Sequence, residues 1–244
     1  MAKNLMVLYG INSILERLRC DPASIRKIFI ERSFTHREIE GLIKAHGVRC
    51  DTVSERDLKR ITRAKDFQKI VAKVERFTYV NFDELMERPA KTTLVFLDGI
   101  NDPHNVGVIM RMLACFGNFA MVLPERGACS VNDTVMHVAS GGENYVQVAR
   151  VDDLKAALAQ ARAIGYSVYA ALPSDTARDL THITFKFPLA LVMGAEAHGI
   201  STDLLDEVDQ QITIPMNGAT LSFNVNNACA IICYEITKQR KAVS

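Results

Sequence analysis

Two stretches decide the fold of this chain, Leu94-Val95-Phe96-Leu97 and Leu189-Ala190-Leu191-Val192-Met193. Both are unbroken apolar runs of strand length, and each leads directly into a loop that contains glycine and polar residues. Continuous runs of this kind are typical of parallel strands that helices bury on both faces. We therefore predict an α/β fold with a doubly wound parallel sheet in the second part of the chain.

The same alternation extends from Thr92 to the end of the chain. Apolar runs predict strands, and apolar residues at helical spacing predict the helices between them. The predicted strands are residues 94–97, 120–123, 145–148, 167–171, 189–193 and 211–214, and the predicted helices are 106–115, 131–138, 154–164 and 225–238.

The first part of the chain predicts a smaller α/β module. Its predicted helices are residues 9–18, 37–46 and 55–62, and its predicted strands are 25–30, 48–53 and 70–74. Residues 77–90 have acidic side chains, a proline and weak periodicity, which is typical of a short helical linker. We therefore expect a first domain over residues 1–78, a linker over 79–90 and a second domain over 91–244.

Charge is distributed unevenly between these parts. The whole chain has a formal net charge of +1, but residues 1–90 hold 18 Lys+Arg and 13 Asp+Glu while residues 91–244 hold 11 and 15. The bias is sharpest over residues 56–76, where basic side chains outnumber acidic ones. Such a patch favours a polyanion such as RNA, although an ordinary solvated helix face has the same composition.

Composition excludes several other classes of protein. A hydrophobic content of 48% with 23% charged residues is that of a globular chain, and no apolar run is long enough to span a bilayer. The N-terminus lacks the pattern of a cleavable signal peptide, so we expect a cytoplasmic protein. The six cysteines form no CxxC pair and have no ligand-spaced histidines, which predicts reduced, mostly buried thiols and no metal site.

Nucleotide-binding fingerprints are missing where a parallel sheet would place them. Neither the GxGxxG motif of dinucleotide folds nor the P-loop motif of nucleotide hydrolases occurs in the chain. Polar residues instead gather in three segments after predicted strands, where ligands bind in open α/β sheets. These segments are residues 101–111, 193–201 and 214–227.

In this order, the three segments resemble the signature motifs of the SpoU (TrmH-like) RNA ribose 2′-O-methyltransferases of the SPOUT superfamily. Asn105 and Arg111 match the first motif, Gly194 and Glu196 match the second, and Ile214-Pro215-Met216 with the run from Ser222 to Asn226 matches the third. Among members of the family, the chain looks most like the guanosine 2′-O-methyltransferases of 23S ribosomal RNA.

The resemblance covers nearly the whole chain and carries several structural expectations. It implies a C-terminal parallel-sheet SPOUT domain with a deep trefoil knot, which pattern analysis alone would exclude because knots are rare. It implies a homodimer formed through this domain. The N-terminal module, which opens with Tyr9-Gly10-Ile11-Asn12, resembles the family's substrate-binding domain and, through it, small ribosomal RNA-binding proteins.

The resemblance also implies S-adenosyl-L-methionine as the cofactor. It would lie in a pocket made by the loops after two strands, where glycine permits close approach of the backbone. The residues carried over for this pocket are Met193, Gly194, Gly199, Ile214, Met216, Phe223 and Asn226. The chain departs from the family pattern at Phe223, usually Leu, at Asn226, usually Ser, and at Phe67-Gln68-Lys69, usually His-Gln-Gly.

Methyl transfer itself is assigned by the resemblance to Asn105, Arg111, Glu196, Ser222 and Asn224. Members of the family have been proposed to use the arginine as a base. We expect Arg111 instead to bind the adjacent phosphate and polarise the ribose hydroxyl, because guanidinium keeps its proton and has no acceptor. A surface role for Arg111 and helix-capping roles for Glu196, Ser222 and Asn224 are the structural alternatives.

We therefore expect an S-adenosyl-L-methionine-dependent enzyme that methylates a ribose 2′-hydroxyl in RNA, most simply a guanosine of 23S rRNA. Two alternatives are a tRNA 2′-O-methyltransferase and a non-catalytic RNA-binding protein that acts in ribosome assembly. In each case RNA is the partner, with no membrane and no metal. The expected RNA-binding residues are Arg56, Lys59, Arg60, Arg63 and Lys69.

Overall fold

The computed structural model describes residues 5–62, 64, 66–87, 92–174, 176–218 and 221–243. The described part of the chain divides into two compact units, one made of residues 1–78 and 131–145 and the other of residues 79–130 and 146–244. None of the described helices is long and apolar enough to cross a membrane.

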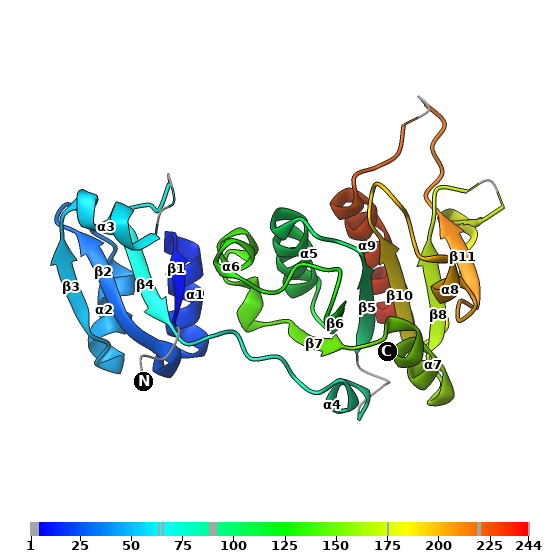
Figure 1. The fold of residues 1–244 in the computed structure, drawn as a ribbon, viewed down its shortest axis with the longest axis horizontal. Coiled ribbons are helices and arrows are strands. Elements are labelled where there is room, and N and C mark those ends of the chain that lie inside the picture. The colour runs from blue at the N-terminus through cyan, green and yellow to red at the C-terminus, as the bar shows by residue number, and fades with distance from the viewer. Residues whose placement is uncertain are drawn as a thin grey trace. The chain divides into compact units, whose positions relative to one another are not determined.

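The first unit is built on a mixed four-stranded sheet in the order β1-β4-β2-β3 (Figure 1). β4 pairs antiparallel with both β1 and β2, and β2 pairs parallel with β3. The strands are β1 Met6–Tyr9, β2 Ile25–Glu31, β3 Cys50–Val53 and β4 Ile70–Val74, and the helices are α1 Ile11–Cys20, η1 Pro22–Ser24, α2 Arg37–His46 and α3 Glu55–Thr62.

The two faces of this sheet are covered differently. Leu8, Ile28 and Ala72 are fully buried on the face where α1 packs against β1 and β4. On the other face Leu58 of α3 packs against Val71, with half-buried apolar side chains around them. The eight-residue α3 covers only part of that face, because Lys73, on the same side of β4 as Val71, is exposed.

Residues 131–145 pack with this first unit although they lie in the middle of the chain. They contain α6 Asp133–Ala139 and η3 Gly142–Asn144. The backbone N–H of Val7 donates to Asp133 at 3.1 Å, and the rings of Tyr9 and His137 stack with centroids 4.0 Å apart. Arg17 donates to the buried carboxylate of Glu143 at 3.2 Å. Polar and aromatic contacts therefore fasten this segment to β1 and α1.

The second unit contains a seven-stranded sheet in the order β7-β6-β5-β10-β8-β11-β9, with every described pairing parallel. The strands are β5 Thr93–Asp98, β6 Phe119–Pro124, β7 Gln147–Val151, β8 Ser167–Ala171, β9 Arg178–Asp179, β10 Leu189–Gly194 and β11 Gln210–Thr213. The helices are α4 Phe82–Met86, α5 Pro103–Phe116, α7 Leu154–Ala163, η4 Leu180–His182, α8 Thr202–Leu205 and α9 Val225–Val243. The α/β fold with a large parallel sheet is therefore confirmed.

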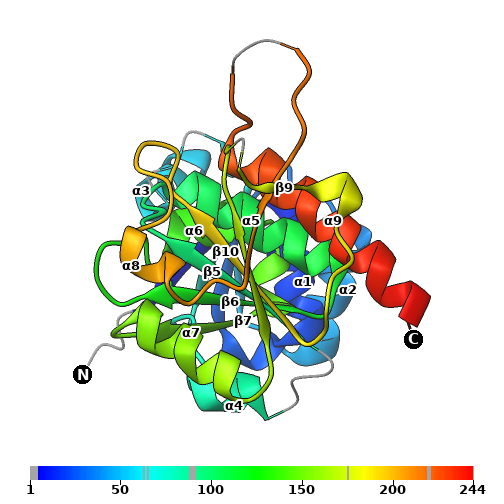
Figure 2. The same ribbon diagram turned by 90° about the vertical axis from the view of Figure 1, so that its right-hand side faces the viewer.

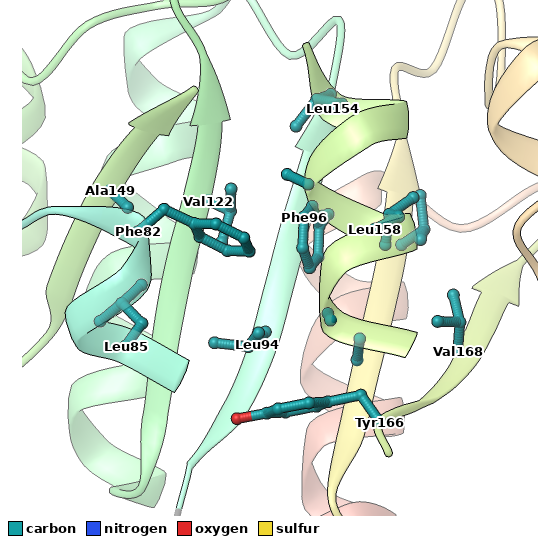
Figure 3. Close-up of a cluster of buried hydrophobic side chains, with 14 of the residues drawn as sticks. Phe82, Leu85, Leu94, Phe96, Val122, Ala149, Leu154, Leu158, Tyr166 and Val168 are labelled. Carbon is teal, nitrogen blue, oxygen red and sulfur yellow. The ribbon is translucent and has the colours of Figure 1, made fainter. Parts of the chain in front are cut away.

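Helices cover both faces of this sheet. Successive residues of a strand point to opposite faces, so the apolar strands present side chains on both. Leu94 and Phe96 face α4, α7 and α8, and Figure 3 shows Phe82 and Leu158 packed over them. Val95 and Leu97 point the other way, toward α5 and α9, which lie side by side (Figure 2). The sheet is therefore a buried middle layer, and its carboxyl edge is free to hold ligands.

Several predicted boundaries needed correction. The predicted helix 9–18 begins instead at Ile11, because Met6–Tyr9 forms β1 and Gly10 turns the chain with φ +93°. The predicted strand 145–148 is instead β7 at Gln147–Val151. The expected linker contains α4, whose Phe82, Leu85 and Met86 are buried in the core of the second unit.

Candidate functional site

The first polar segment forms the turn from β5 into α5. Gly99 has φ +66°, a left-handed conformation that favours glycine, and it redirects the chain after the strand. The side chain of Asp102 caps α5 by accepting from the backbone N–H of His104 at 2.9 Å. Asn105 follows in the first helical turn and is half-buried. The turn therefore holds Asn105 at the carboxyl edge of the sheet.

Arg111 lies six residues further along α5 and is exposed. Within the part of the chain that the structure describes, no hydrogen bond or ion pair holds its guanidinium. Val108, one turn earlier on the same helix, is 39% exposed. This strip of α5 therefore offers one unengaged cation beside an apolar side chain.

The second polar segment is a tight loop after β10. Ala195 and Gly199 form a bridge in which the backbone N–H of Gly199 donates to Ala195 at 2.8 Å. A Cβ atom on Gly194 would lie 2.3 Å from the Gly199 backbone, a distance that no real side chain shows. The loop can therefore close only because residue 194 has no side chain.

Glu196, in this loop, connects it to the start of α9. One of its carboxylate oxygens accepts from the side-chain amide of Asn224 and, at 3.2 Å, from the backbone N–H of Val225. Asn224 in turn accepts from the backbone N–H of Asn226 at 2.8 Å. Glu196 and Asn224 thus act as helix caps, which does not prevent a functional role because both sit beside the pocket described below.

Asn226 continues this network to α5. Its amide N–H donates to the side-chain oxygen of Asn105 at 2.8 Å. Its own amide oxygen is buried and has no hydrogen-bond partner in the described chain. Hydrogen bonds therefore run from Glu196 through Asn224 and Asn226 to Asn105, and they link the first, second and third polar segments.

A pocket opens at the carboxyl ends of β8, β10 and β11, against the start of α9. Its lining is mostly apolar, with Glu196, Thr213 and Ser222 as polar members. The lining residues are Ala171, Leu172, Pro173, Met193, Gly194, Ala195, Glu196, Gly199, Ile212, Thr213, Ile214, Met216, Ser222, Phe223, Val225, Ala228 and Ile232. Such a mostly apolar concavity at a sheet edge is a typical small-molecule site.

The pocket collects most of the expected cofactor residues. Met193, Gly194, Gly199, Ile214, Met216 and Phe223 all line it, whereas Asn226 lies outside it and contacts Asn105. Among the expected catalytic residues, Glu196 and Ser222 line the pocket, while Asn105, Arg111 and Asn224 do not. The described parts of the chain between β11 and α9 extend away from the sheet (Figure 2), leaving Met216 and Phe223 40% and 43% exposed.

Sequence inspection missed one wall of the pocket. Ala171 ends β8, which lies between β10 and β11 in the sheet, and Leu172 and Pro173 follow it. Because these residues are apolar, a search for polar groups after strands overlooks them. The signal that could have found them is position alone, since the carboxyl end of every strand in a parallel sheet meets the same edge.

The expected RNA-binding residues lie in the first unit. Arg56, Lys59 and Arg60 are exposed on α3, where Lys59 pairs with Glu55 and Arg60 approaches Asp57 at 3.7 Å. Lys69 has φ +63° and donates to the hydroxyl of Ser33 at 2.7 Å. Arg63 lies outside the described residues.

The cysteines need a partial correction. All six are free, but only Cys229 and Cys233 are buried, while Cys20 and Cys115 are exposed. Burial raises the pKa of the Cys233 thiol well above its ordinary value, which makes it a poor nucleophile. No group of three or more metal-ligating side chains occurs among the described residues.

Comparisons with known proteins found relatives and solved structures that match nearly the whole chain. A relative in Ralstonia nicotianae, a 23S rRNA (guanosine-2′-O-)-methyltransferase RlmB, is 33% identical over 242 residues and covers 97% of each chain. An uncharacterized tRNA/rRNA methyltransferase of Synechocystis sp. is 34% identical over 96% of this chain, which spans 62% of that relative's length. The SpoU methyltransferase AviRb from Streptomyces viridochromogenes, solved in complex with AdoMet, is 20% identical with a TM-score of 0.79, covering 98% of this chain and 91% of its own.

Two family models match the chain. The model for RNA 2′-O ribose methyltransferase substrate binding matches residues 7–80, and the model of the SpoU rRNA Methylase family matches residues 92–234. The second match includes the pocket, the loop of Gly194 and the turn that holds Asn105. The chain therefore belongs to the SpoU rRNA methylase family.

Proposed function

We propose that this protein transfers a methyl group from S-adenosyl-L-methionine to a ribose 2′-hydroxyl of RNA. The proposed target is a guanosine of 23S rRNA. The observation that carries the proposal is the pocket at the carboxyl ends of β10 and β11, which the second and third polar segments line and to which Asn226 links the first segment through Asn105. The rRNA assignment rests on relatives such as the Ralstonia enzyme.

The pocket residues fit S-adenosyl-L-methionine. Apolar side chains such as Ile214 and Ile232 suit an adenine ring, and Gly194 leaves one wall without a side chain. Residues 214–218 lie outside helices and strands, so their backbone groups are available to hydrogen-bond a ligand. When bound, the cofactor supplies an electrophilic methyl group on a positively charged sulfur.

The polar residues around the pocket have separate tasks in this proposal. Glu196 fixes the start of α9 through its bonds to Asn224 and Val225, and so holds the wall that carries Ser222 and Phe223. Asn105, held by Asn226, contributes a side-chain amide on the RNA side. Arg111 binds the phosphate next to the target ribose and polarises its hydroxyl, because a guanidinium can donate several hydrogen bonds but accept none.

RNA capture is assigned to the first unit, within the segment that matches the substrate-binding model. Arg56, Lys59, Arg60, Arg63 and Lys69 are proposed to contact phosphates, and the ion pairs of Lys59 and Arg60 with neighbouring carboxylates can exchange for them. We keep residues 1–78, 79–90 and 91–244 as the proposed domain division, with the cytoplasm, where ribosomal RNA is found, as the proposed location.

Membership in the family supports a deep trefoil knot around the segment between β11 and α9, and a homodimer formed through the second domain.

Exposed apolar side chains on α5 and α9 favour the dimer. Val108, Ile231 and Tyr234 are 39%, 37% and 61% exposed, and the Tyr234 ring lies 6.5 Å from that of Phe116. Sedimentation velocity of the wild type and of Tyr234→Glu tests this: the variant should shift from dimer to monomer.

The function is tested by mapping ribose methylation across total RNA in cells with and without this chain. Loss of one 23S rRNA methyl group is expected; loss at a tRNA site would favour the tRNA alternative. If no site changed and calorimetry detected no cofactor binding, the RNA-binding alternative would replace the enzyme.

Arg111→Ala separates chemistry from cofactor binding. Because Arg111 lies outside the pocket and is not held by other described residues, the variant should bind S-adenosyl-L-methionine with unchanged affinity. Methyl transfer should fall about 100-fold or more, the usual cost of removing a charge-stabilising donor. Lost cofactor affinity would contradict the role assigned to Arg111.

A further inference from the structure

A pair of lysines faces each other on the open part of the first unit's sheet. Lys27 of β2 lies directly opposite Lys73 of β4 in the antiparallel register. Lys73 is exposed, and the Lys27 side chain is 35% exposed. Like charges at directly opposed positions repel and cost stability, so the pairing is not explained by packing.

Both ammonium groups converge on one aromatic ring. The Nζ atoms of Lys27 and Lys73 lie 5.3 and 5.9 Å from the centroid of Phe29, two residues along β2 from Lys27. The negative face of the ring attracts cations at such distances. Phe29 thereby helps to hold two positive charges close together.

Only part of this charge is neutralised by the protein. Lys27 forms an ion pair with Asp51, which lies opposite Phe29 on β3. Lys73 forms no ion pair with any carboxylate that the structure describes. An anion that approaches this face can therefore bind the ammonium group of Lys73 directly. It can also bind Lys27 if that side chain exchanges its exposed partner, Asp51, for the anion.

The same face of the sheet carries α3. Leu58 packs on Val71, the residue two before Lys73 on β4, so α3 and the lysine pair share one side of the sheet. Arg56, Lys59 and Arg60 project from the exposed surface of α3. The basic side chains of the helix and the lysine pair thus form one surface, which runs from α3 onto the open sheet.

We propose that Lys27 and Lys73 form a phosphate-binding pair for the RNA backbone, so that substrate RNA crosses the open sheet face as well as α3. The proposal rests on the proposed function for its partner, and it extends the RNA surface beyond the residues named there. Charge complementarity identifies RNA as the occupant, because a backbone phosphate can accept from both ammoniums at once.

Lys73→Ala tests the pair in the full-length chain, with protein-free 23S rRNA as the probe. Lys73 is exposed and forms no ion pair with a described carboxylate, and its removal relieves the repulsion from Lys27, so the thermal unfolding midpoint should not fall. RNA affinity should fall about 3- to 10-fold near 0.1 M salt, and the slope of log affinity against log salt should shrink by about 0.7 to 0.9. Lys73→Gln, which keeps most of the side chain's length, should behave alike.

Lys44→Ala is the matched control. Lys44 is an exposed lysine on α2 and belongs to the same unit, but it lies away from α3 and the open sheet face. Its removal should change neither affinity nor salt slope by more than the error. Equal effects of Lys44→Ala and Lys73→Ala, or no effect of either, would overturn the proposal, since the binding would then depend on net charge alone or on another surface.

Methyl transfer to the same RNA distinguishes this proposal from the proposed function. Lys73→Ala should raise KM for RNA and leave kcat and cofactor affinity unchanged. If the wild-type chain bound RNA through Lys73 but neither bound cofactor nor transferred a methyl group, the proposed function would be wrong. The phosphate-binding role of the lysine pair would then still be supported. A wild-type chain that fails to bind RNA would overturn the pair itself.

Discussion

At the scale of single residues, the second polar segment shows how one missing side chain shapes a site. The loop from Gly194 to Gly199 doubles back so closely that backbone occupies the place of a Cβ at residue 194. Gly218 lies in the third polar segment, and a Cβ there would meet nothing within 4 Å. Position 194 therefore has no room for a side chain, whereas position 218 does. The sequence alone does not distinguish them, because both are glycines in loops.

Gly194→Ala is expected to abolish measurable cofactor binding, because the added methyl group must displace the Gly199 backbone and open the pocket wall. Isothermal titration with S-adenosyl-L-methionine measures the loss. Gly218→Ala is the control, with affinity expected within about twofold of wild type because a residue in open space changes stability and geometry little. Equal losses in the two variants would show that loop flexibility, and not the close approach, governs binding.

Asn226 was expected in the cofactor site, and its structural surroundings lead to a more specific prediction. Its amide holds Asn105, and it does not line the pocket. Asn226→Ala should therefore lower kcat about 10-fold with cofactor affinity unchanged, since misplacing a positioning group weakens transition-state contacts. Asn226→Ser, the residue usual in the family, should recover part of the activity. A fall in cofactor affinity with unchanged kcat would return Asn226 to the cofactor site.

At the scale of elements, local patterns predicted more than long-range packing did. The predicted helices 37–46 and 55–62 and the predicted strand 70–74 coincide with α2, α3 and β4, because their apolar periodicity is strong. β1 was missed because it has four residues and runs directly into α1 through Gly10. The strand-end rule found the loops of β5, β10 and β11 but overlooked β8, whose end is apolar.

Residues 131–145 show why sequence position is a poor guide to packing. Local periodicity correctly indicated a helix there, but it gave no sign that α6 and η3 pack with β1 and α1. The contacts that do so join residues 126 apart, such as Arg17 and Glu143. A single sequence carries no signal of such pairing, because either side chain would look ordinary on a solvated helix.

Glu143 gives this packed segment a pH dependence. Burial raises the pKa of its carboxyl group despite the nearby Arg17, so the folded state holds the proton more tightly than the unfolded chain. Its stabilising contribution is therefore complete below the ordinary glutamate pKa of about 4.3 and is lost as pH rises through the folded value. Glu143→Gln, which cannot titrate, is the reference.

The free energy of unfolding is measured for the wild type and for Glu143→Gln between about pH 4 and pH 8, a range that begins near the ordinary glutamate pKa. The value for the variant is subtracted from that for the wild type. This difference should fall as pH rises. A difference that instead rose with pH would mean that the ion pair with Arg17 outweighs burial and lowers the pKa of Glu143.

At the scale of the whole molecule, a formal net charge of +1 conceals two regions of opposite sign. The first 90 residues have the excess of basic side chains, and α3 displays three of them on its exposed surface. The pocket and the residues assigned to methyl transfer lie in the other unit. Capture of RNA and chemistry on it are thus assigned to different parts of one chain, and they should be separable by mutation.

Arg56→Ala combined with Arg60→Ala tests that separation. Two phosphate contacts should be lost, so KM for RNA should rise about 10-fold and the salt slope should shrink by about 1.4 to 1.8, with kcat and cofactor affinity unchanged. Lys186→Ala is the control, because this exposed lysine lies just before β10, at the sheet edge opposite the pocket. Its KM should match the wild type. A lower kcat at saturating RNA in the double variant would mean that α3 also places the ribose for reaction, and capture and chemistry could then no longer be assigned to separate parts of the chain.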